Sequence, residues 1–234
     1  MLSLRRSEER GHADHGWLDA HHTFSFADYH DPDWMGFGPL RVLNQDRVAP
    51  GQGFAPHDHH DMEIVTWVLE GTLQHRDSMG HGSLIRAGEV QFMSAGTGVT
   101  HSEMNPSPDT PVHLLQMWVR PARRATSPRY GQRAIPAAAR RGRLALAVSP
   151  DGRDGSLPIG RDASLFVGLF DGDESARHAL APRRLGWLHV ARGEITANGE
   201  PLGPGDGLGL THEAQLEVSA GRDAEVVFWD LPDA

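Results

Sequence analysis

Two pairs of residues in this chain have side chains that commonly bind metal ions in proteins. His57 and His59 form a His-x-His pair, and His101 and Glu103 form a His-x-Glu pair later in the chain. Alternate side chains of a β-strand lie on one face, so the members of each pair point the same way. Two imidazoles about 6.6 Å apart along a strand can reach one ion at ligand distances of about 2 Å. Two such pairs on neighbouring strands predict a single metal site with four ligands.

The donor atoms of this predicted site are nitrogen and oxygen, because the chain contains no cysteine. Sulfur-rich zinc sites and iron–sulfur clusters are thereby excluded. Three neutral imidazoles and one carboxylate suit several divalent transition ions and leave one or two coordination positions open. We expect Fe(II) in this site, and the donor set leaves Ni, Mn, Cu, Zn and Co open as alternatives.

The other histidines are not expected to form a second metal site. Those near the N-terminus follow no spacing that is typical of metal ligands, and we expect ordinary surface or core roles for His12, His15, His21, His22 and His30. His75 and His81 fall in a turn-rich hairpin, where we expect them to face solvent.

The elements that must position the ligands are predicted to be short β-strands. Apolar runs bounded by Gly, Pro, Asp or Ser are typical of strands, and the clearest are 62–69, 91–94, 112–119, 144–148 and 216–229. The 27 Gly and 16 Pro residues supply the frequent turns that an all-β chain needs. Helical periodicity is weak, and only 137–143 and 174–180 could form a turn or two of helix.

A faint internal repeat divides the chain into two halves. The segment containing Gly71 and Gly88 resembles the one containing Gly193 and Gly205, each with a strand, a turn and a second strand. Two antiparallel β-barrels in tandem explain this repeat: an N-terminal metal-binding barrel over residues 1–130 and a C-terminal barrel over residues 131–234. The Arg-rich segment 120–143 is then expected to be a solvated connector.

The C-terminal barrel is predicted to lack a metal site. If Gly71 and Gly193 are equivalent, positions 57 and 59 correspond to Ala179 and Ala181, which cannot bind an ion. We expect this barrel to be structural and to cover apolar surface of the first, with a separate partner-binding role left open.

Composition excludes several classes of function. The net charge is -9, and nucleic acids or anionic membranes need a clustered positive surface, so neither is expected as a partner. All 22 basic residues are Arg, which rules out lysine Schiff-base catalysis. No apolar run approaches the length of a membrane span, and the first 17 residues are charged rather than apolar. A cytoplasmic protein is therefore expected.

The two ligand segments resemble the motifs of the cupin superfamily, G-x5-H-x-H-x3-4-E-x6-G and G-x5-P-x-G-x2-H-x3-N. The matching residues are Gly51, His57, His59, Gly88, Gly96, His101 and Asn105. Three features depart from these motifs. The usual acidic position falls on Ile64, Ser94 stands where proline is usual, and four residues rather than two separate Gly96 from His101.

These departures resemble the pirin branch of the superfamily, whose second motif supplies the acidic ligand as His-x-Glu. His101 and Glu103 match that arrangement. Further likeness extends over 16–29, 61–64, 94–98, 128–130 and 151–156, so it covers most of the chain and is closest to bacterial pirin-like proteins. The resemblance implies a bicupin fold.

The resemblance also implies a reaction, the opening of a flavonol such as quercetin by O2 with release of carbon monoxide. Glu103 would then be both a ligand and the general base that accepts the proton of the flavonol 3-hydroxyl. The residues beside the ligand strands that could line the substrate pocket are Phe54, Met62, Met93 and Gln116. The alternative is a binding module without catalytic activity, in which the metal's oxidation state alters a surface recognised by a regulatory protein.

Overall fold

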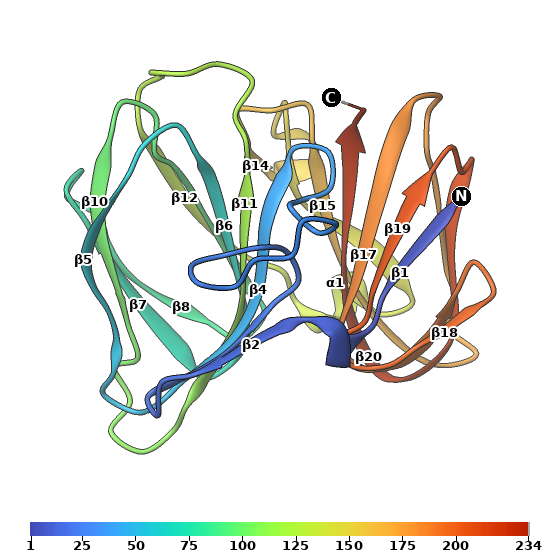
Figure 1. Cartoon of the computed structure of the whole chain (residues 1–234), viewed down its shortest axis with the longest axis horizontal. Coiled ribbons are helices and arrows are strands. Elements are labelled where there is room, and N and C mark those ends of the chain that lie inside the picture. Colours follow the sequence, from blue (N-terminus) through green and yellow to red (C-terminus); the bar gives the residue numbers. More distant parts are fainter. Residues whose placement is uncertain (234) are drawn as a thin grey trace.

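The computed structural model describes residues 1–233, which form two β-barrels side by side (Figure 1). The N-terminal barrel consists of two sheets. A seven-stranded sheet contains, in spatial order, β12 (Arg129–Ala134), β9 (Glu89–Ser94), β6 (Glu63–Glu70), β11 (Val112–Val119), β4 (Leu40–Val48), β3 (Leu18–His22) and β2 (Gly11–Asp14). A four-stranded sheet faces it and contains β5 (Gly53–His59), β10 (Val99–Met104), β7 (Thr72–Asp77) and β8 (Gly82–Arg86).

The C-terminal barrel is formed by one nine-stranded sheet. Its main path is β1 (Leu2–Arg5), β19 (Gly207–Thr211), β17 (Arg184–Ala197), β20 (Gln215–Pro232), β15 (Ser164–Gly172), β13 (Arg143–Ser149) and β14 (Leu157–Pro158), and β16 (Ala176–Ala179) and β18 (Glu200–Leu202) pair beside it. Within residues 1–233, helix is confined to α1 (Ala137–Arg140) and two 3-10 turns, at Ser7–Glu9 and Arg153–Gly155. The all-β, two-barrel prediction is confirmed.

The central strands of the N-terminal barrel are apolar on both faces. In β6, Ile64 and Val68 point into the barrel, whereas Val65 and Trp67 point out of it toward the second barrel. Because both faces of β6 are covered, its sequence reads as a nearly continuous apolar run rather than as an alternating one. This explains why β6 was among the strands most clearly predicted.

The largest hydrophobic cluster lies between the two barrels. It joins Trp67 and Met117 of the N-terminal barrel to Trp187 and Trp229 of the C-terminal barrel, all completely buried. A second cluster fills the interior of the C-terminal barrel. The expectation that the second barrel covers apolar surface of the first is therefore confirmed.

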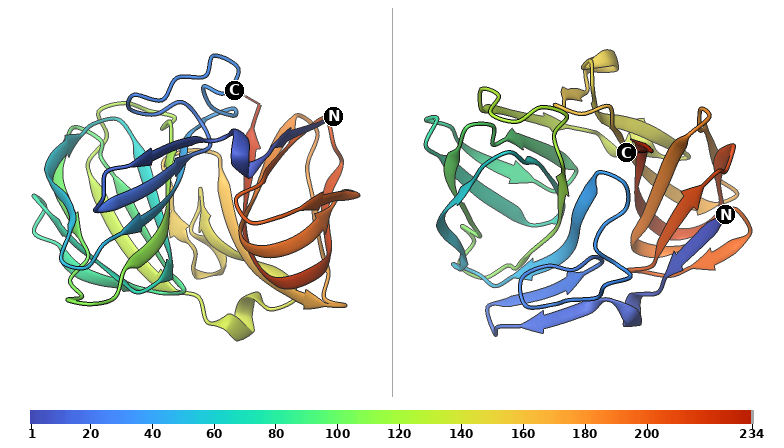
Figure 2. Two further views of the ribbon diagram at one scale, coloured as in Figure 1. Left: turned by 60° about the horizontal axis from the view of Figure 1, so that its bottom comes forward. Right: turned by 45° about the horizontal axis from the view of Figure 1, so that its top comes forward.

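The chain crosses between the barrels at both ends of the N-terminal half. Strand β1 comes first in the chain but pairs antiparallel with β19 of the C-terminal barrel, with Leu2 opposite Leu210 (Figure 2). Strand β12 pairs with β9, so residues 129–134 belong to the N-terminal barrel's sheet. The division at residue 130 remains a prediction. Two segments lie across this boundary: β1 belongs to the sheet of the C-terminal barrel, and residues 131–134 of β12 belong to the sheet of the N-terminal barrel.

Two local expectations are wrong. The segment 120–143 is more than a solvated connector, because it contains β12 and α1, and Arg140 is buried. Residues 176–179 form strand β16 rather than helix, since pairing with the long strand β20 satisfies their backbone. In both cases tertiary contacts override a weak local pattern.

The glycines that suggested the repeat occupy matching backbone conformations. Gly71 and Gly193 have φ of +74° and +64°, a region that favours glycine. A Cβ atom at Gly71 would lie 2.7 Å from the Pro111 carbonyl oxygen, and one at Gly193 would lie 2.3 Å from that of Arg222. Each turn therefore requires glycine for conformation and for space.

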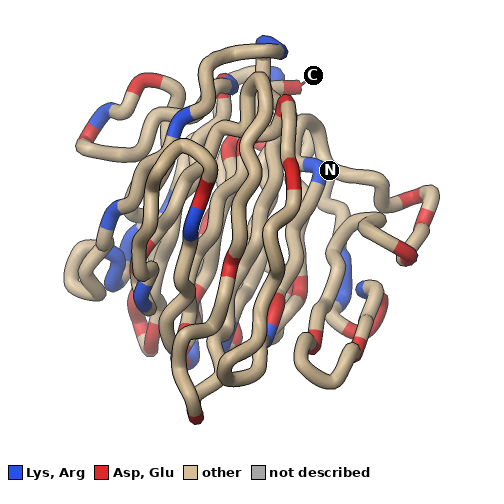
Figure 3. The backbone as a smooth tube through the Cα atoms, turned by 90° about the vertical axis from the view of Figure 1, so that its left-hand side faces the viewer, with Lys and Arg blue, Asp and Glu red and all other residues tan. Residues whose placement is uncertain are grey.

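Acidic and basic residues are interspersed over the side of the molecule that carries the four-stranded sheet (Figure 3). No helix among the described residues is long and apolar enough to cross a membrane. The expected lack of nucleic-acid and membrane partners remains a prediction.

A polar network lies within the interface between the barrels. Gln45 contacts Nε2 of His113 at 3.0 Å and Nε2 of His189 at 3.2 Å, and it accepts a hydrogen bond from Arg10. Burial lowers the pKa of His113 to about 3, helped by the positive charges of neighbouring arginines, and burial also lowers the pKa of His189 well below 6.5. Both imidazoles are therefore neutral in the folded protein at pH 7.

We expect stability to fall as the pH falls below about 6.5. A histidine whose pKa is lower when folded binds its proton more readily in the unfolded chain, so acid favours unfolding from pH 6.5 down toward the folded value. Between pH 7 and pH 5 His113 should cost about 2 kcal/mol. Between pH 7 and pH 5, urea unfolding of His113→Gln should show a smaller loss of unfolding free energy than the parent protein. His15→Gln, at an exposed position, should lose as much as the parent protein. An identical pH dependence for all three proteins would contradict this assignment.

Candidate metal centre

The four predicted ligands lie on two paired strands of the four-stranded sheet. Strands β5 and β10 run antiparallel with His57 opposite His101, and a register shift separates His101 from Glu103. His101 and Glu103 are buried, and all four side chains line one cavity inside the N-terminal barrel. The alternation read from the sequence therefore places them on the same face.

The three imidazoles converge on a common point. The ring centroids of His57 and His101 are 4.5 Å apart, and each lies 4.9 Å from that of His59. One nitrogen from each ring lies within 4.8 Å of the other two. Because ligands share an ion at about 2 Å, small movements of the rings would allow all three to bind one ion.

The ligand atom of Glu103 lies within 4.8 Å of those of His101 and His75, in a second group that shares only His101 with the three imidazoles. Oε2 of Glu103 accepts a hydrogen bond from Nε2 of Gln116 at 2.8 Å, and Oε1 of Gln116 accepts one from the Thr66 hydroxyl at 3.2 Å. Oε1 of Glu103 and both ring nitrogens of His101 are buried without a hydrogen-bond partner within residues 1–233. Buried polar atoms left unpaired are unfavourable, and a divalent ion would be a suitable partner for them.

The protonation states of the imidazoles favour metal binding. Nδ1–H of His57 donates to the Ala55 carbonyl at 2.8 Å, which leaves Nε2 free to bind a metal. Burial lowers the pKa of His101 to about 3 and that of His59 to about 4, and in both cases neighbouring histidines lower it further. Burial raises the pKa of Glu103 to about 7, opposed by the hydrogen bond from Gln116. The rings of His59 and His101 are therefore uncharged at pH 7, with their lone pairs available.

A cavity of about 250 Å³ opens beside this group. Its apolar walls are Phe26, Phe54, Ile64 and Trp118, and its polar residues beyond the ligands are Asn44, Asp46 and Gln116. Among the pocket residues predicted from the sequence, Phe54 and Gln116 line the cavity. Met93 is instead packed in an apolar cluster with Ile64 and Val99, and Met62 contacts the same cluster.

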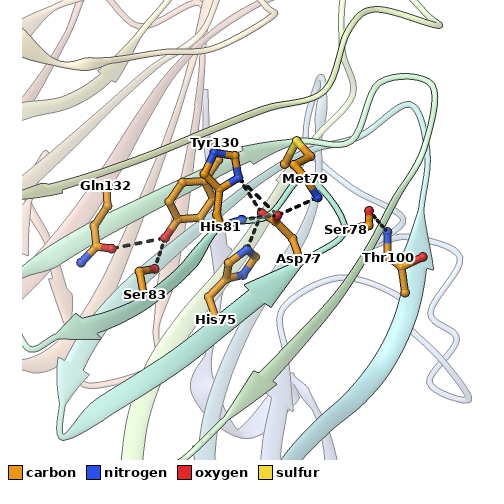
Figure 4. Close-up of polar contacts among 9 residues, drawn as sticks. All are labelled: His75, Asp77, Ser78, Met79, His81, Ser83, Thr100, Tyr130 and Gln132. Carbon is orange, nitrogen blue, oxygen red and sulfur yellow. Dashed lines mark hydrogen bonds and ion pairs between the residues drawn. The ribbon is translucent and has the colours of Figure 1, made fainter.

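His75 was expected to face solvent, and that expectation is wrong. Its side chain is fully buried, its ring centroid lies 5.3 Å from that of His101, and its ligand atom lies within 4.8 Å of those of His101 and Glu103. Nε2 of His75 is 2.9 Å from the carboxylate of Asp77, which also contacts His81 at 3.1 Å (Figure 4). His75 and Asp77 alternate on β7, so the same period-2 pattern could have revealed them.

An aromatic ring fixes the position of these histidines. Tyr130 stacks on His75 and on His81, with ring centroids 4.8 Å apart in each case. Its hydroxyl is hydrogen-bonded to Ser83 and Gln132 (Figure 4). His81, by contrast, is 44% exposed, which agrees with its predicted position near solvent.

The N-terminal hairpin brings together three side chains that their sequence spacing did not connect. His12 and His21 are opposite each other on β2 and β3, and their rings stack at 4.4 Å. Nε2 of His12 lies 2.8 Å from a carboxylate oxygen of Asp19, and Nδ1 of His21 lies 3.7 Å from the same atom. Sequence spacing does not show this proximity, because it arises across strands.

A two-barrel, all-β fold with a histidine-rich cavity in one barrel is the arrangement of metal-binding bicupins. The chain matches the Pirin family over residues 3–119 and the quercetinase C-terminal cupin domain over residues 146–231. This protein belongs to the pirin family.

Relatives match the chain over nearly its whole length. It is 48% identical to "Quercetin 2,3-dioxygenase" of Escherichia coli K12 over 99% of both chains, and 40% identical to "Pirin-like protein" of Caulobacter vibrioides over 98% of this chain and 99% of that one. The crystal structure of YhhW from Escherichia coli superposes with a TM-score of 0.96 at 47% identity, covering 100% of this chain and 99% of that one. A structure of the bacterial pirin YhhW in complex with nickel(II) superposes with a TM-score of 0.95 at 47% identity, covering both chains completely.

Proposed function

We propose that this chain is a metal-dependent dioxygenase that opens flavonols such as quercetin with O2 and releases carbon monoxide. The observation that carries this proposal is the convergence of three imidazoles, with Glu103 beside His101, next to a cavity with aromatic walls. Identity of 48% to a protein named quercetin 2,3-dioxygenase supports it over the whole chain. A regulatory binding module would not require an aromatic-lined cavity beside the ion.

In this proposal His57, His59, His101 and Glu103 hold one divalent ion, Fe(II) in our assignment. When bound, such an ion supplies Lewis-acid polarisation of a substrate oxygen and orients that substrate beside O2. The nickel(II) complex of YhhW supports metal binding by this chain and leaves the metal's identity in this chain as a proposal.

The protein's own side chains bind the substrate and move its proton. Phe26, Phe54 and Trp118 would contact the flat faces of the flavonol and exclude water from the cavity. Oε1 of Glu103, which has no partner among the described residues, would accept the proton of the 3-hydroxyl. Gln116 holds the other carboxylate oxygen at 2.8 Å and so fixes the direction in which Oε1 points.

The proposal is tested by metal loading followed by exposure to substrate and air. Protein purified without a histidine tag should bind one divalent ion per chain by elemental analysis, and His101→Ala should bind far less. After anaerobic loading with Fe(II), admission of air should abolish the absorbance of added quercetin and consume O2. Unchanged absorbance with a full equivalent of each candidate ion would reject the dioxygenase and favour the binding module.

A further inference from the structure

Asp46 is a buried carboxyl group in the substrate cavity that the proposed reaction does not use. It lies on β4, two residues from Asn44 and therefore on the same inner face of the barrel, and it is 4% exposed. Its cross-strand neighbours are Ala20 on β3 and Leu114 on β11, which are both apolar and buried. The sheet thus offers this carboxyl no polar partner on either side.

The side chain of Asp46 is left unpaired by the fold. Its Oδ1 is buried without a hydrogen bond from any residue between 1 and 233. Glu103, the other acidic side chain that lines the cavity, has one oxygen fixed by Gln116 and its ligand atom close to those of His75 and His101. Burying an acidic group without a partner is unfavourable, so a bound molecule that supplies one gains binding energy at Asp46.

The cavity around Asp46 suits an aromatic ring that carries hydroxyl groups. Phe26 and Trp118 meet edge to face, with ring centroids 5.4 Å apart, and with Phe54 they line the cavity with aromatic surface. Such walls bind ring faces and offer no acceptor to the proton of a substituent hydroxyl. A carboxyl group can exchange hydrogen bonds with a phenol in either protonation state.

We propose that Asp46 binds a phenolic hydroxyl of the substrate other than the one held beside the imidazoles, and so makes the site select polyhydroxylated flavonols. This inference rests on the proposed function, because it presumes that a flavonol occupies the cavity. Asp46 is then a specificity-determining residue rather than a member of the metal centre.

The test compares two ligands on protein that cannot turn over. Zinc is not redox-active, so zinc-loaded protein under nitrogen allows equilibrium binding to be measured by quenching of tryptophan fluorescence. Quercetin is compared with 3-hydroxyflavone, which keeps the 3-hydroxyl and the 4-carbonyl and lacks the other hydroxyls. The variants are Asp46→Leu, which has a similar shape without polar atoms, and Asp46→Asn, which keeps a hydrogen-bonding group; zinc content is measured for each.

Asp46→Leu should weaken quercetin binding by about 10- to 100-fold and change 3-hydroxyflavone binding by less than about threefold. Asp46→Asn should retain most of the preference for quercetin. Repeating the comparison with flavonols that lack only the 5-hydroxyl, only the 7-hydroxyl or only the hydroxyls of the pendant ring identifies the group bound. The flavonol whose binding does not change with Asp46→Leu is the one that lacks the hydroxyl bound by Asp46.

Two results would overturn the assignment. Equal weakening of both ligands would mean that Asp46 only maintains the shape of the cavity, and no weakening of either would mean that it does not contact the substrate. Failure of both flavonols to bind the unmodified zinc-loaded protein is a different outcome. It would reject the proposed function, and the role of Asp46 with it.

Discussion

Glu103→Gln should lower the turnover of quercetin by about 10²- to 10⁴-fold, the range expected when a general base is removed. An amide has nearly the same shape as the carboxylate but cannot accept the 3-hydroxyl proton, and its oxygen can still bind a metal weakly. Gln116 donates to one oxygen of Glu103 at 2.8 Å, so the single oxygen of the variant is available either to Gln116 or to the metal. The measurement is kcat at saturating quercetin and O2, divided by the metal content of each preparation.

The control for this change is Glu8→Gln, which removes a carboxylate at an exposed position far from β10 in the sequence. Its turnover per bound metal should match that of the parent protein. Flavonol binding to zinc-loaded Glu103→Gln should remain measurable, which separates loss of the base from loss of the pocket. If the variant keeps its turnover per bound metal, Glu103 is not the base and only its role as a ligand survives.

The ligand strands could be predicted from the sequence because their pattern is local. His57 with His59, and His101 with Glu103, each need only the two-residue period of a strand to share a face. Glycines such as Gly71, whose conformation admits few other residues, marked the turns between strands. The fold class and the candidate site therefore followed from short-range rules.

The features that could not be predicted depend on register between strands. Asp46 lies in the cavity because β4 pairs with β11, and nothing near it in the sequence shows that its neighbours will be Ala20 and Leu114. His12 and His21 meet because they are opposite each other in a hairpin, and no spacing typical of ligands connects them. Such contacts need the strand pairing to be known first.

Arg140, at the interface between the barrels, is another residue whose contacts could not be predicted from the local sequence. An arginine within an Arg-rich segment is most often solvated, yet Arg140 has only 10% of its side chain exposed. Its partner, Glu225, is on β20 of the C-terminal barrel, and no local pattern joins the two. Part of this Arg-rich segment therefore contributes to the interface between the barrels, which its composition did not predict.

Arg140, Trp67 and Glu225 form a buried cluster that connects three parts of the chain. Nη1 of Arg140 donates to Oε1 of Glu225 at 2.7 Å, and the same oxygen accepts the indole N–H of Trp67 at 2.9 Å. The guanidinium also lies over the Trp67 ring, 5.1 Å from its centroid, and its Nε donates to the Ile135 carbonyl. Trp67 belongs to the N-terminal barrel and Glu225 to the C-terminal barrel, so the cluster joins the two.

Arg140→Ala should destabilise the protein by about 3–5 kcal/mol, because it leaves the buried carboxylate of Glu225 with only Arg192, 3.9 Å away, as a cation. Arg141→Ala is the matched control: Arg141 is 56% exposed and 3.8 Å from Glu174, and its loss should cost less than about 0.5 kcal/mol. The double change Arg140→Met with Glu225→Gln removes both charges and keeps an acceptor for Trp67, so it should recover most of the stability lost by Arg140→Ala.

Urea unfolding at constant metal content measures all three. Similar losses for Arg140→Ala and Arg141→Ala would show that the pair contributes little to the interface, whereas failure of the double variant to recover stability would show that packing of the arginine on Trp67 matters more than its charge.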